Sequence, residues 1–305
     1  MRTLVIGASG LVGEALYRQS GRNTVGTYFQ HPRPGLVQLD IRNAQAVASL
    51  LREFRPEVVY LPAAQPNVDR CENDAAESYS INVEGTKTVA AFAREVKARL
   101  VFFSTDYVFD GNDGPYREEV PTSPMSVYGC HKLEAERAVL AANERNLVVR
   151  VCGVYGYEPA GKNFVMSFVR RVRAGQTVRV PSDQWGNPTY VEDVARAVRT
   201  IFEGGATRIW HVAAPDYLPR VEFALRICEE FDLPLNAFEG VPTSLLRQSA
   251  LRPLRGGLDT TRLRRYFPHC LPRPVAEGLR AMRERWEEAQ RDPGSQGRGE
   301  GGTRG

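Results

Sequence analysis

Tyr128 and Lys132 lie four residues apart in the run Tyr128-Gly129-Cys130-His131-Lys132. On an α-helix this spacing corresponds to ~40° of rotation and about one turn of rise, so both side chains share a face. A tyrosine with a pKa of about 10 is a poor proton donor or acceptor at neutral pH. A lysine ammonium ~4 Å away contributes about 4 kcal/mol at an effective dielectric near 20, roughly three pKa units. We therefore expect an acid–base pair in which Lys132 lowers the pKa of Tyr128.

Thr105 is placed where it could join this pair. It follows Ser104 and the apolar run 100–103, which is expected to be a buried parallel strand. Ligands of parallel sheets bind beyond the carboxyl ends of the strands, so the Thr105 hydroxyl could hydrogen-bond a reacting oxygen. A threonine also suits an ordinary turn at a strand end. Of the two interpretations we favour the first, and we expect Thr105, Tyr128 and Lys132 to form the catalytic group.

Three glycines, Gly7, Gly10 and Gly13, follow the apolar run 4–6 and open a helical pattern at 11–19. In this strand–turn–helix context the spacing is typical of a dinucleotide-binding loop. Gly7 and Gly10 allow a tight turn and close approach to a pyrophosphate, and Gly13 allows the helix to pack closely on the strand. The helix N-terminus adds free N–H groups and the positive end of its dipole. The alternative is a glycine-rich turn without a ligand.

The residues after the second expected strand bear on the choice of dinucleotide. An NAD-selective site usually has an acidic residue there to accept the ribose 2′-OH, but residues 27–33 contain no carboxylate. Arg33 or His31 could instead meet a 2′-phosphate, which favours NADPH over NADH, although Arg33 also suits a solvated turn. Asp40, after the next strand, is better placed for the adenine edge.

The elements that must position these residues alternate along the first half of the chain. Short apolar or β-branched runs predict strands, and patterns with helical spacing follow most of them. This alternation predicts an α/β protein with a Rossmann-type, doubly wound parallel sheet covered on both faces. The expected strands are 4–6, 24–28, 36–39, 58–61, 100–103 and 147–151, and the expected helices are 11–19, 44–54, 75–96 and 127–143.

After residue 153 glycine, proline and aromatic residues separate shorter elements. A helix at 191–202 and a strand at 208–212 are expected to return to the sheet, and a charged helix is expected at 274–290. We therefore predict a nicotinamide dinucleotide domain and a smaller C-terminal substrate-binding lobe. The first comprises 1–153 plus about 188–212, the second 154–187 and 213–290, and the polar, glycine-rich tail 292–305 is expected to be disordered.

Composition narrows the functional classes. The net charge of +4 is mild, and no basic stripe interleaved with aromatic residues indicates a nucleic-acid partner. No run approaches the ~18 apolar residues that span a bilayer, so a cytoplasmic enzyme without a membrane partner is expected. His131 is expected to be a surface histidine, and neither the histidines nor the cysteines have the spacing of a metal site or a disulfide framework. The cysteines are Cys71, Cys130, Cys152, Cys228 and Cys270.

Several segments in the same order resemble the extended short-chain dehydrogenase/reductase family, in its dTDP-4-dehydrorhamnose reductase branch. The resemblance runs to about residue 285, and the segments 105–111 and 183–189 are specific to this branch. The matching pieces are 103–111, Pro115-Tyr116, Tyr128-Gly129 with Lys132 and Glu136, Asp183-Gln184 with Gly186 and Pro188-Thr189, Arg252-Pro253, and Leu258-Asp259.

The resemblance implies an NAD(P)H-dependent reductase that delivers hydride to C4 of a 4-keto-6-deoxy sugar nucleotide. Tyr128 would protonate the developing alkoxide, Lys132 would hold the nicotinamide ribose, and Thr105 would polarise the ketone. It also implies two groups of binding residues. Gly10, Leu11, Val12, Asp40, Ile41, Ala63, Ala64 and Gln65 would bind the cofactor, and Thr105, Asp106, Asp183 and Gln184 would bind the substrate.

Departures from the pattern leave the sugar open. Gly153 stands where these reductases usually have a tryptophan of the sugar pocket, and Arg255 and Gly256 replace the usual asparagine and serine. A sugar-nucleotide epimerase on the same scaffold is an alternative. A dehydratase is not expected, because its Asp-Glu pair is here Asp106-Tyr107.

A third interpretation is not enzymatic. The run 106–119 is also similar to the regulatory beta subunit of methionine adenosyltransferase, which keeps the dinucleotide fold as a partner-binding module. We place catalysis first because the substrate-side segment 183–189 is intact. A homodimer is possible for this fold, but no interface can be identified from the residues.

Overall fold

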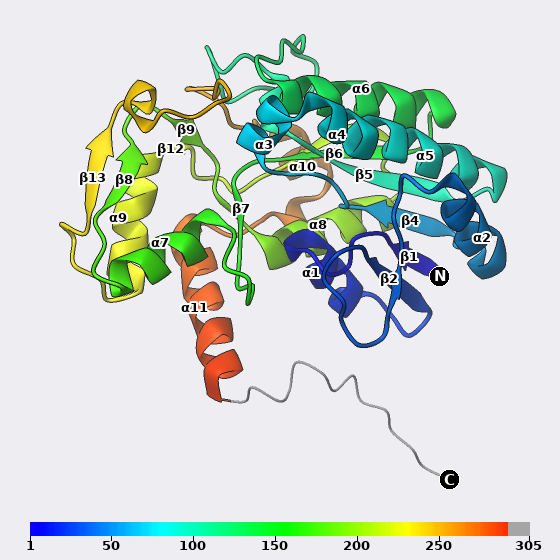
Figure 1. Ribbon diagram of the computed structural model, residues 1–305, viewed down its shortest axis with the longest axis horizontal. Helices are drawn as coiled ribbons and strands as arrows, with labels where there is room; N and C mark the ends of the chain where they lie inside the picture. The colour runs from blue at the N-terminus through cyan, green and yellow to red at the C-terminus, as the bar shows by residue number, and fades with distance from the viewer. Residues whose placement is uncertain (292–305) are drawn as a thin grey trace.

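The computed structural model describes residues 1–291, and its centre is a seven-stranded, wholly parallel sheet (Figure 1). The strand order is β11-β6-β5-β4-β1-β2-β3. The chain runs outward from β1 to β3, then returns across β1 to continue with β4 on the other side. This reversal marks the crevice where ligands bind in such sheets. The strands are β1 Thr3–Val5, β2 Thr24–Tyr28, β3 Leu36–Gln38, β4 Val58–Leu61, β5 Arg99–Thr105, β6 Leu147–Val151 and β11 Arg208–Val212.

Helices cover both faces of this sheet, as Figure 1 shows. Successive strand residues point to opposite faces, so Leu4 enters the core under one helical layer and Val5 the core under the other. One layer consists of α2 Ala44–Phe54, α5 Thr86–Glu95 and α6 Val127–Ala142, and the other contains α1 Leu11–Gln19 and α8 Val191–Glu203. The expected α/β class and doubly wound sheet are confirmed.

The expectation of a mostly helical segment at 75–96 is confirmed, but the helix is not a single regular α-helix. The chain forms α3 Val68–Asn73 and α4 Ala75–Tyr79, then a π-helix at Ser80–Gly85, and only then α5. The wider π turn places Asn82 in the interior, where it is 2% exposed. Single π turns inside helices are rare and often lie at functional sites.

A smaller lobe lies beside the carboxyl ends of the strands, at the left of Figure 1. Its sheets have only two strands each: β7 pairs with β10, β9 with β12 and β8 with β13. The hydrophobic core continues from Val5 of the large sheet to Phe223 and Leu279 of the lobe. The lobe elements are β7 Val154–Tyr155, α7 Phe164–Arg173, β8 Val178–Pro181, β9 Trp185–Gly186, β10 Thr189–Tyr190, β12 Leu218–Pro219, α9 Arg220–Glu230, β13 Phe238–Val241 and α11 Val275–Arg291. The short helix α10 Thr261–Tyr266 packs instead on β11 of the large sheet.

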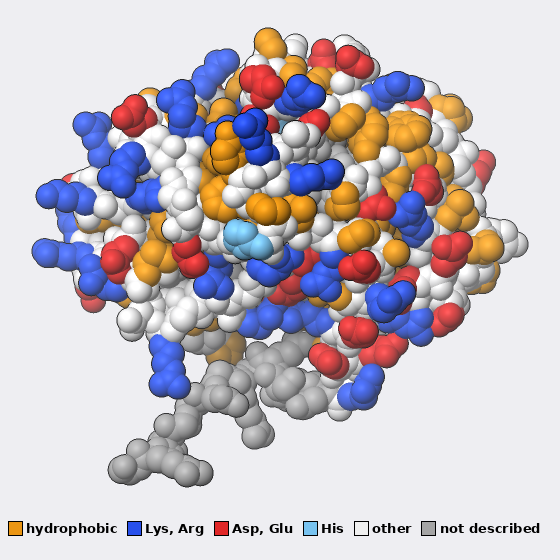
Figure 2. Space-filling view, turned by 180° about the vertical axis from the view of Figure 1, so that it is seen from behind, with side chains coloured by type: hydrophobic (Ala, Val, Ile, Leu, Met, Phe, Trp, Pro, Cys, Tyr) orange, Lys and Arg blue, Asp and Glu red, His pale blue; other side chains and the backbone are white. Residues whose placement is uncertain are grey.

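The late elements expected to return to the sheet do so, since α8 begins at Val191 and β11 pairs with β6 in parallel. The tail 292–305 lies outside the described residues. Within the described part of the chain, no helix combines the length and apolarity that a membrane crossing requires. Figure 2 shows acidic and basic side chains interspersed over the face that it draws.

Candidate active site

The structure brings the three expected catalytic residues together. Thr105 is the last residue of β5, and α6 begins at Val127, one residue after its cap Ser126, whose Oγ accepts a hydrogen bond from the Gly129 amide at 3.2 Å. Tyr128 lies in the first turn of α6, and Thr105 is among the side chains that act on its phenol. The end of β5 and the start of α6 thus lie together at one corner of the crevice, although a long segment of chain connects them.

The electrostatics of Tyr128 differ from the expectation. Burial raises the pKa of its phenol above the ordinary value, the nearby Cys71, Tyr107 and Asp106 raise this pKa further, and the Thr105 side chain opposes them. Lys132 is not among the groups with the largest effects on the pKa of Tyr128. The expected lowering of the Tyr128 pKa by Lys132 is therefore wrong for this structure, because loss of water around the phenol outweighs attraction by the ammonium. The phenol is held protonated.

Lys132 occupies the next turn of α6 and is 3% exposed. Its Nζ lies 4.0 Å from the centroid of the Phe102 ring. Burial lowers the pKa of this ammonium to about 7, and the neighbouring Glu136 works in the opposite direction. Lys132 therefore changes charge close to neutral pH, unlike an exposed lysine.

Asp106 is buried, and protein groups already bind both of its oxygens. Its Oδ2 accepts from the Cys152 thiol and from the Gly257 amide, both at 3.1 Å, and its Oδ1 accepts from the Thr105 hydroxyl at 3.2 Å. Burial raises the pKa of this carboxyl. Asp106 thus joins the ends of β5 and β6 to a loop of the lobe. From the sequence we expected Asp106 to contact the substrate, and these contacts within the protein were not anticipated.

The glycine loop forms a cradle at the start of α1. Gly7 has φ +96°, and a Cβ there would lie 2.9 Å from Ala63. A Cβ on Gly13 would lie 2.1 Å from the Gly7 carbonyl oxygen. Gly10 caps α1 without a side chain, and a Cβ there would meet only the Gly7 oxygen, at 3.5 Å. The N–H groups of the first helical turn, to which Leu11 and Val12 belong, have no partner within the helix, and such groups suit a pyrophosphate.

Cationic side chains gather after β2, where the sequence lacks a carboxylate. Arg33 pairs with Glu14 of α1 at 2.6 Å, and His31 lies 3.2 Å from Lys162 of the lobe. Lys162 was not recognised from the sequence, since it lies far along the chain.

Asp40 and Ile41 follow β3. Asp40 pairs with Arg42 at 2.6 Å, which holds the pKa of that carboxyl below its usual range. Arg42 in turn lies over the Phe29 ring, 5.3 Å from its centroid. Ile41 is buried, and a Cβ on Gly85 would touch it at 2.7 Å. Arg42 is a second cation that the sequence pattern did not single out.

The loop after β4 contains Ala63, Ala64 and Gln65. Ala63 donates its amide to the Ile6 carbonyl at 3.1 Å, beside the glycine cradle. The Gln65 amide donates to Asn82 Oδ1 at 2.8 Å, and Asn82 Nδ2 donates back to the Gln65 carbonyl at 3.2 Å. Asn82 was missed from the sequence, although an asparagine on the apolar face of an expected helix is a detectable signal.

The expected substrate residues of the lobe are bound to another loop. Asp183 accepts from the backbone amide of Thr243 at 2.9 Å and from its hydroxyl at 2.5 Å. Gln184 Nε2 donates to the same hydroxyl at 3.1 Å. Gly153 has φ +53° and lies against Pro188, so the backbone itself favours glycine where a tryptophan was expected.

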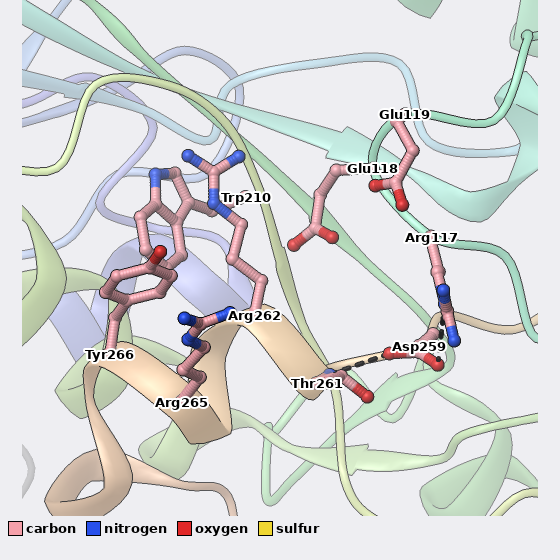
Figure 3. A pocket seen from close by; sticks show the side chains of 9 residues that line it. All are labelled: Arg117, Glu118, Glu119, Trp210, Asp259, Thr261, Arg262, Arg265 and Tyr266. Atoms are coloured by element: carbon pink, nitrogen blue, oxygen red, sulfur yellow. Dashed lines mark hydrogen bonds and ion pairs between the residues drawn. The ribbon is translucent and has the colours of Figure 1, made fainter.

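A hollow of about 530 Å³ lies away from this crevice, between β11, α10 and the loop 117–119 (Figure 3). Arg262 lies over Trp210 and donates to the Ile209 carbonyl at 3.1 Å, and Glu118 accepts from the His211 amide at 3.1 Å. These charged side chains occupy the outer edge of β11, which would otherwise offer unpaired backbone groups.

His131 is not the surface histidine that was expected. It is half-buried, and its Nδ1 lies 2.9 Å from the Ser78 hydroxyl. The Tyr79 ring meets it edge-on at a centroid distance of 5.3 Å. Among the described residues no group of three histidine, cysteine or acidic side chains could hold a metal ion, and all five cysteines are free.

A glycine cradle at the switch point of a doubly wound sheet, with Thr105, Tyr128 and Lys132 beside it, defines a dinucleotide-binding protein of the extended short-chain dehydrogenase/reductase type. The match to known families is more specific. The model of the RmlD substrate binding domain matches residues 1–287, and the chain belongs to this family.

Its relatives include both an enzyme and a subunit. Methionine adenosyltransferase 2 subunit beta of Bos taurus is 32% identical over 272 residues, 86% of this chain and 81% of the relative. The dTDP-4-dehydrorhamnose reductase of Aggregatibacter actinomycetemcomitans is 31% identical over 282 residues, 87% and 93% of the two chains. The solved dTDP-4-dehydrorhamnose reductase of Bacillus anthracis, in complex with NADP, has a TM-score of 0.86 and 27% identity, covering 93% and 99%.

Proposed function

We propose that the chain is an NAD(P)H-dependent reductase of a 4-keto-6-deoxy sugar nucleotide. The observation that carries the proposal is the Thr105, Tyr128 and Lys132 group beside the glycine cradle, in a member of a family with reductase relatives. The lobe segments 154–187 and 213–290 would bind the sugar nucleotide, because they border the carboxyl ends of the strands.

The residues of the crevice suit a nicotinamide dinucleotide, which when bound supplies the hydride for C4. Gly10 and the first turn of α1 would hold its pyrophosphate, and the loop 63–65 would lie beside it. Arg33 and Arg42 follow β2 and β3, each paired with a carboxylate, and Lys162 lies beside His31. A 2′-phosphate would give these cations a further anionic partner, which favours NADPH over NADH.

The chain's own residues account for the proton and the orientation of the ketone. The Thr105 hydroxyl, which donates to Asp106 Oδ1 in the structure, would turn its proton to the ketone oxygen and polarise the carbonyl group. Tyr128 would then donate its phenolic proton to the alkoxide, and burial ensures that this proton is present at neutral pH. The Lys132 ammonium would bind the nicotinamide ribose and stabilise the phenolate that remains.

A regulatory subunit is the second candidate, and one observation favours it. The chain is as similar to methionine adenosyltransferase 2 subunit beta as to the reductase, with 32% and 31% identity over most of its length. In that case the dinucleotide fold would serve as a module that binds a catalytic partner. Thr105, Tyr128 and Lys132 do not exclude this role, and we place the reductase first because the substrate-side segment 183–189 is intact.

The test is reduction of dTDP-4-dehydro-6-deoxy-L-mannose by the purified chain with NADPH, and with NADH in parallel. We expect loss of reduced-nicotinamide absorbance, faster with NADPH, and a drop of about 10²–10⁴-fold in Tyr128→Phe. Oxidation of one NADPH for each sugar nucleotide reduced would exclude an epimerase, because an epimerase keeps and regenerates its cofactor. Tight NADPH binding without turnover of any dehydro-sugar nucleotide, together with capture of an adenosyltransferase, would support the regulatory subunit instead.

A further inference from the structure

Helix α6 carries the proposed proton donor, and the loop 63–65 is proposed to lie against the cofactor. These two segments are joined by an unbroken chain of polar contacts through the α4 and π-helix region. The chain runs from Gln65 to Asn82, from Asn82 to Ser78 and from Ser78 to His131 on α6. Ser78 and Asn82 are 0% and 2% exposed, so water does not compete for these contacts.

The direction of each hydrogen bond follows from the donors available. The Asn82 side-chain oxygen must accept from the Gln65 N–H, and its amide nitrogen must donate to the Gln65 carbonyl. The flipped amide would place two donors against each other at one contact and two acceptors at the other. The same amide nitrogen donates to the Ser78 hydroxyl oxygen at 3.3 Å. Ser78 therefore has its own proton free to donate to His131 Nδ1, 2.9 Å away. A neutral imidazole with its proton on Nε2 completes this one-way chain.

We propose that His131 is a positioning residue, which uses its neutral Nδ1 to couple helix α6 to the loop 63–65. This inference rests on the proposed function for its link to the cofactor. The π turn is what makes the coupling geometrically possible, because it brings Asn82 inward between the two segments. Losing the acceptor at His131 leaves the buried Ser78 proton without a partner and loosens the loop.

The charge around His131 decides how the coupling responds to pH. Burial lowers the pKa of the imidazole, and Glu134 on the same helix opposes this shift. Glu134 is itself paired with Lys87 of α5 at 2.7 Å and accepts from Tyr79 of α4 at 2.9 Å. Glu72 of α3 accepts from the Val127 amide, and Arg70 of α3 pairs with Glu77 of α4. The other charged residues on α3, α4, the π-helix and α6 are Asp69 of α3, Glu84 of the π-helix, and Lys132, Glu136 and Arg137 of α6 itself. Below the pKa of the imidazole, Nδ1 carries a proton and can only donate. The Ser78–His131 hydrogen bond must then run from His131 to Ser78.

The experiment compares His131→Ala with His131→Asn, whose Oδ1 preserves an acceptor near the Nδ1 position but does not titrate. Ser78→Ala breaks the chain from the other side, and Cys130→Ala is the control on an exposed neighbouring position. Two quantities are measured between pH 5.5 and about 8: the NADPH dissociation constant, and amide hydrogen exchange of the peptide 63–67 without nucleotide.

We expect His131→Ala and Ser78→Ala each to weaken NADPH binding roughly three- to tenfold and to speed exchange of that peptide by a similar factor. The double variant should be no weaker than either single one, because both remove the same chain. The unmodified chain should bind NADPH more weakly at acid pH, where His131 becomes protonated, and His131→Asn should match it at pH 8 but lose this acid decline.

Unchanged exchange at 63–67 in His131→Ala would overturn the proposal, as would a His131→Asn variant that behaves like His131→Ala. If the unmodified chain binds neither NADPH nor NADH, the proposed function fails. The exchange measurement then still decides whether His131 holds the loop, so the two failures remain distinguishable.

Discussion

On the sheet side of the molecule, the residues proposed for chemistry lie on consecutive turns of one helix or on a single strand–helix connection. On the lobe side, Asp183 instead reaches Thr243, sixty residues farther along the chain. The first region is held by parallel strands and buried polar contacts, and the second by two-stranded sheets and loops. The proposed reaction would therefore depend on a rigid local frame, and the proposed substrate choice on contacts that can vary without disturbing that frame.

Buried charge offers the sharpest way to test this difference. Glu136 of α6 and Arg150 of β6 form a bidentate pair at 2.9 and 2.7 Å, with both side chains 2% exposed. Glu136→Gln leaves the guanidinium buried without its counter-charge, and we expect a loss of about 3–5 kcal/mol of unfolding free energy. Denaturant titration followed by circular dichroism measures it.

The matched control is the same substitution in the lobe. Glu222 pairs with Arg226 at 2.6 Å on the solvated side of α9. Arg226 also pairs with Asp216 at 2.8 Å, so it retains a carboxylate partner when Glu222 is replaced. Glu222→Gln should cost no more than about 1 kcal/mol. Equal losses for the two variants would remove the distinction between the two regions.

The glycine cradle gives the next largest effect. A Cβ on Gly13 would lie 2.1 Å from the Gly7 carbonyl oxygen, so Gly13→Ala forces α1 away from the loop. We expect about 1–3 kcal/mol of destabilisation and a comparable weakening of NADPH binding, roughly 5- to 150-fold. Gly21→Ala is the control, because a Cβ there meets nothing within 4 Å. A Gly13→Ala variant with unchanged NADPH affinity would contradict the placement of the pyrophosphate.

Lys132 predicts a pH dependence on the sheet side. Burial lowers the pKa of its ammonium to about 7, so the cation is present below that pH and is lost above it. NADPH affinity should therefore fall as pH rises through 7, by at most about tenfold per pH unit for one proton. Isothermal titration over pH 6.5 to about 9 measures the slope.

Lys132→Met should bind NADPH weakly and show no such alkaline decline. Lys87→Met removes a half-exposed lysine paired with Glu134 and should keep the decline. If NADPH affinity still declines with rising pH in Lys132→Met, the titrating group is not Lys132.

Much of the sheet side could be predicted from the sequence, because its signals are local. The helix 44–54 and the strands 58–61 and 147–151 have the expected bounds. Each of them is defined by the pattern of apolar residues within its own segment. The π turn at Asn82 and the raised pKa of Tyr128 could not be predicted. Both depend on which distant side chains surround a residue, and hydrophobic periodicity carries no information about that.

The lobe was predicted less well for the same reason. Asp183 and Gln184 were recognised only through resemblance, and their partner Thr243 has no local sequence signal. The two-stranded sheets are likewise defined by pairings such as β8 with β13, which join residues about sixty positions apart. Contacts of this range are set by how the lobe packs rather than by any one segment.

Thr243→Val provides the smallest and most selective test of that long-range contact. The substitution keeps the shape of the side chain and the backbone amide that donates to Asp183, but removes the hydroxyl that donates to Asp183 and accepts from Gln184. Two hydrogen bonds at about 1 kcal/mol or less each should loosen the loop 182–184 without unfolding the lobe. Because the glycine cradle and α6 are untouched, NADPH affinity should stay constant while KM for the sugar nucleotide rises roughly fivefold. Thr243→Ser, which restores the hydroxyl, should recover the original KM. A parallel rise in the NADPH dissociation constant would show that the two regions are coupled after all, and that the lobe loops help to build the cofactor side.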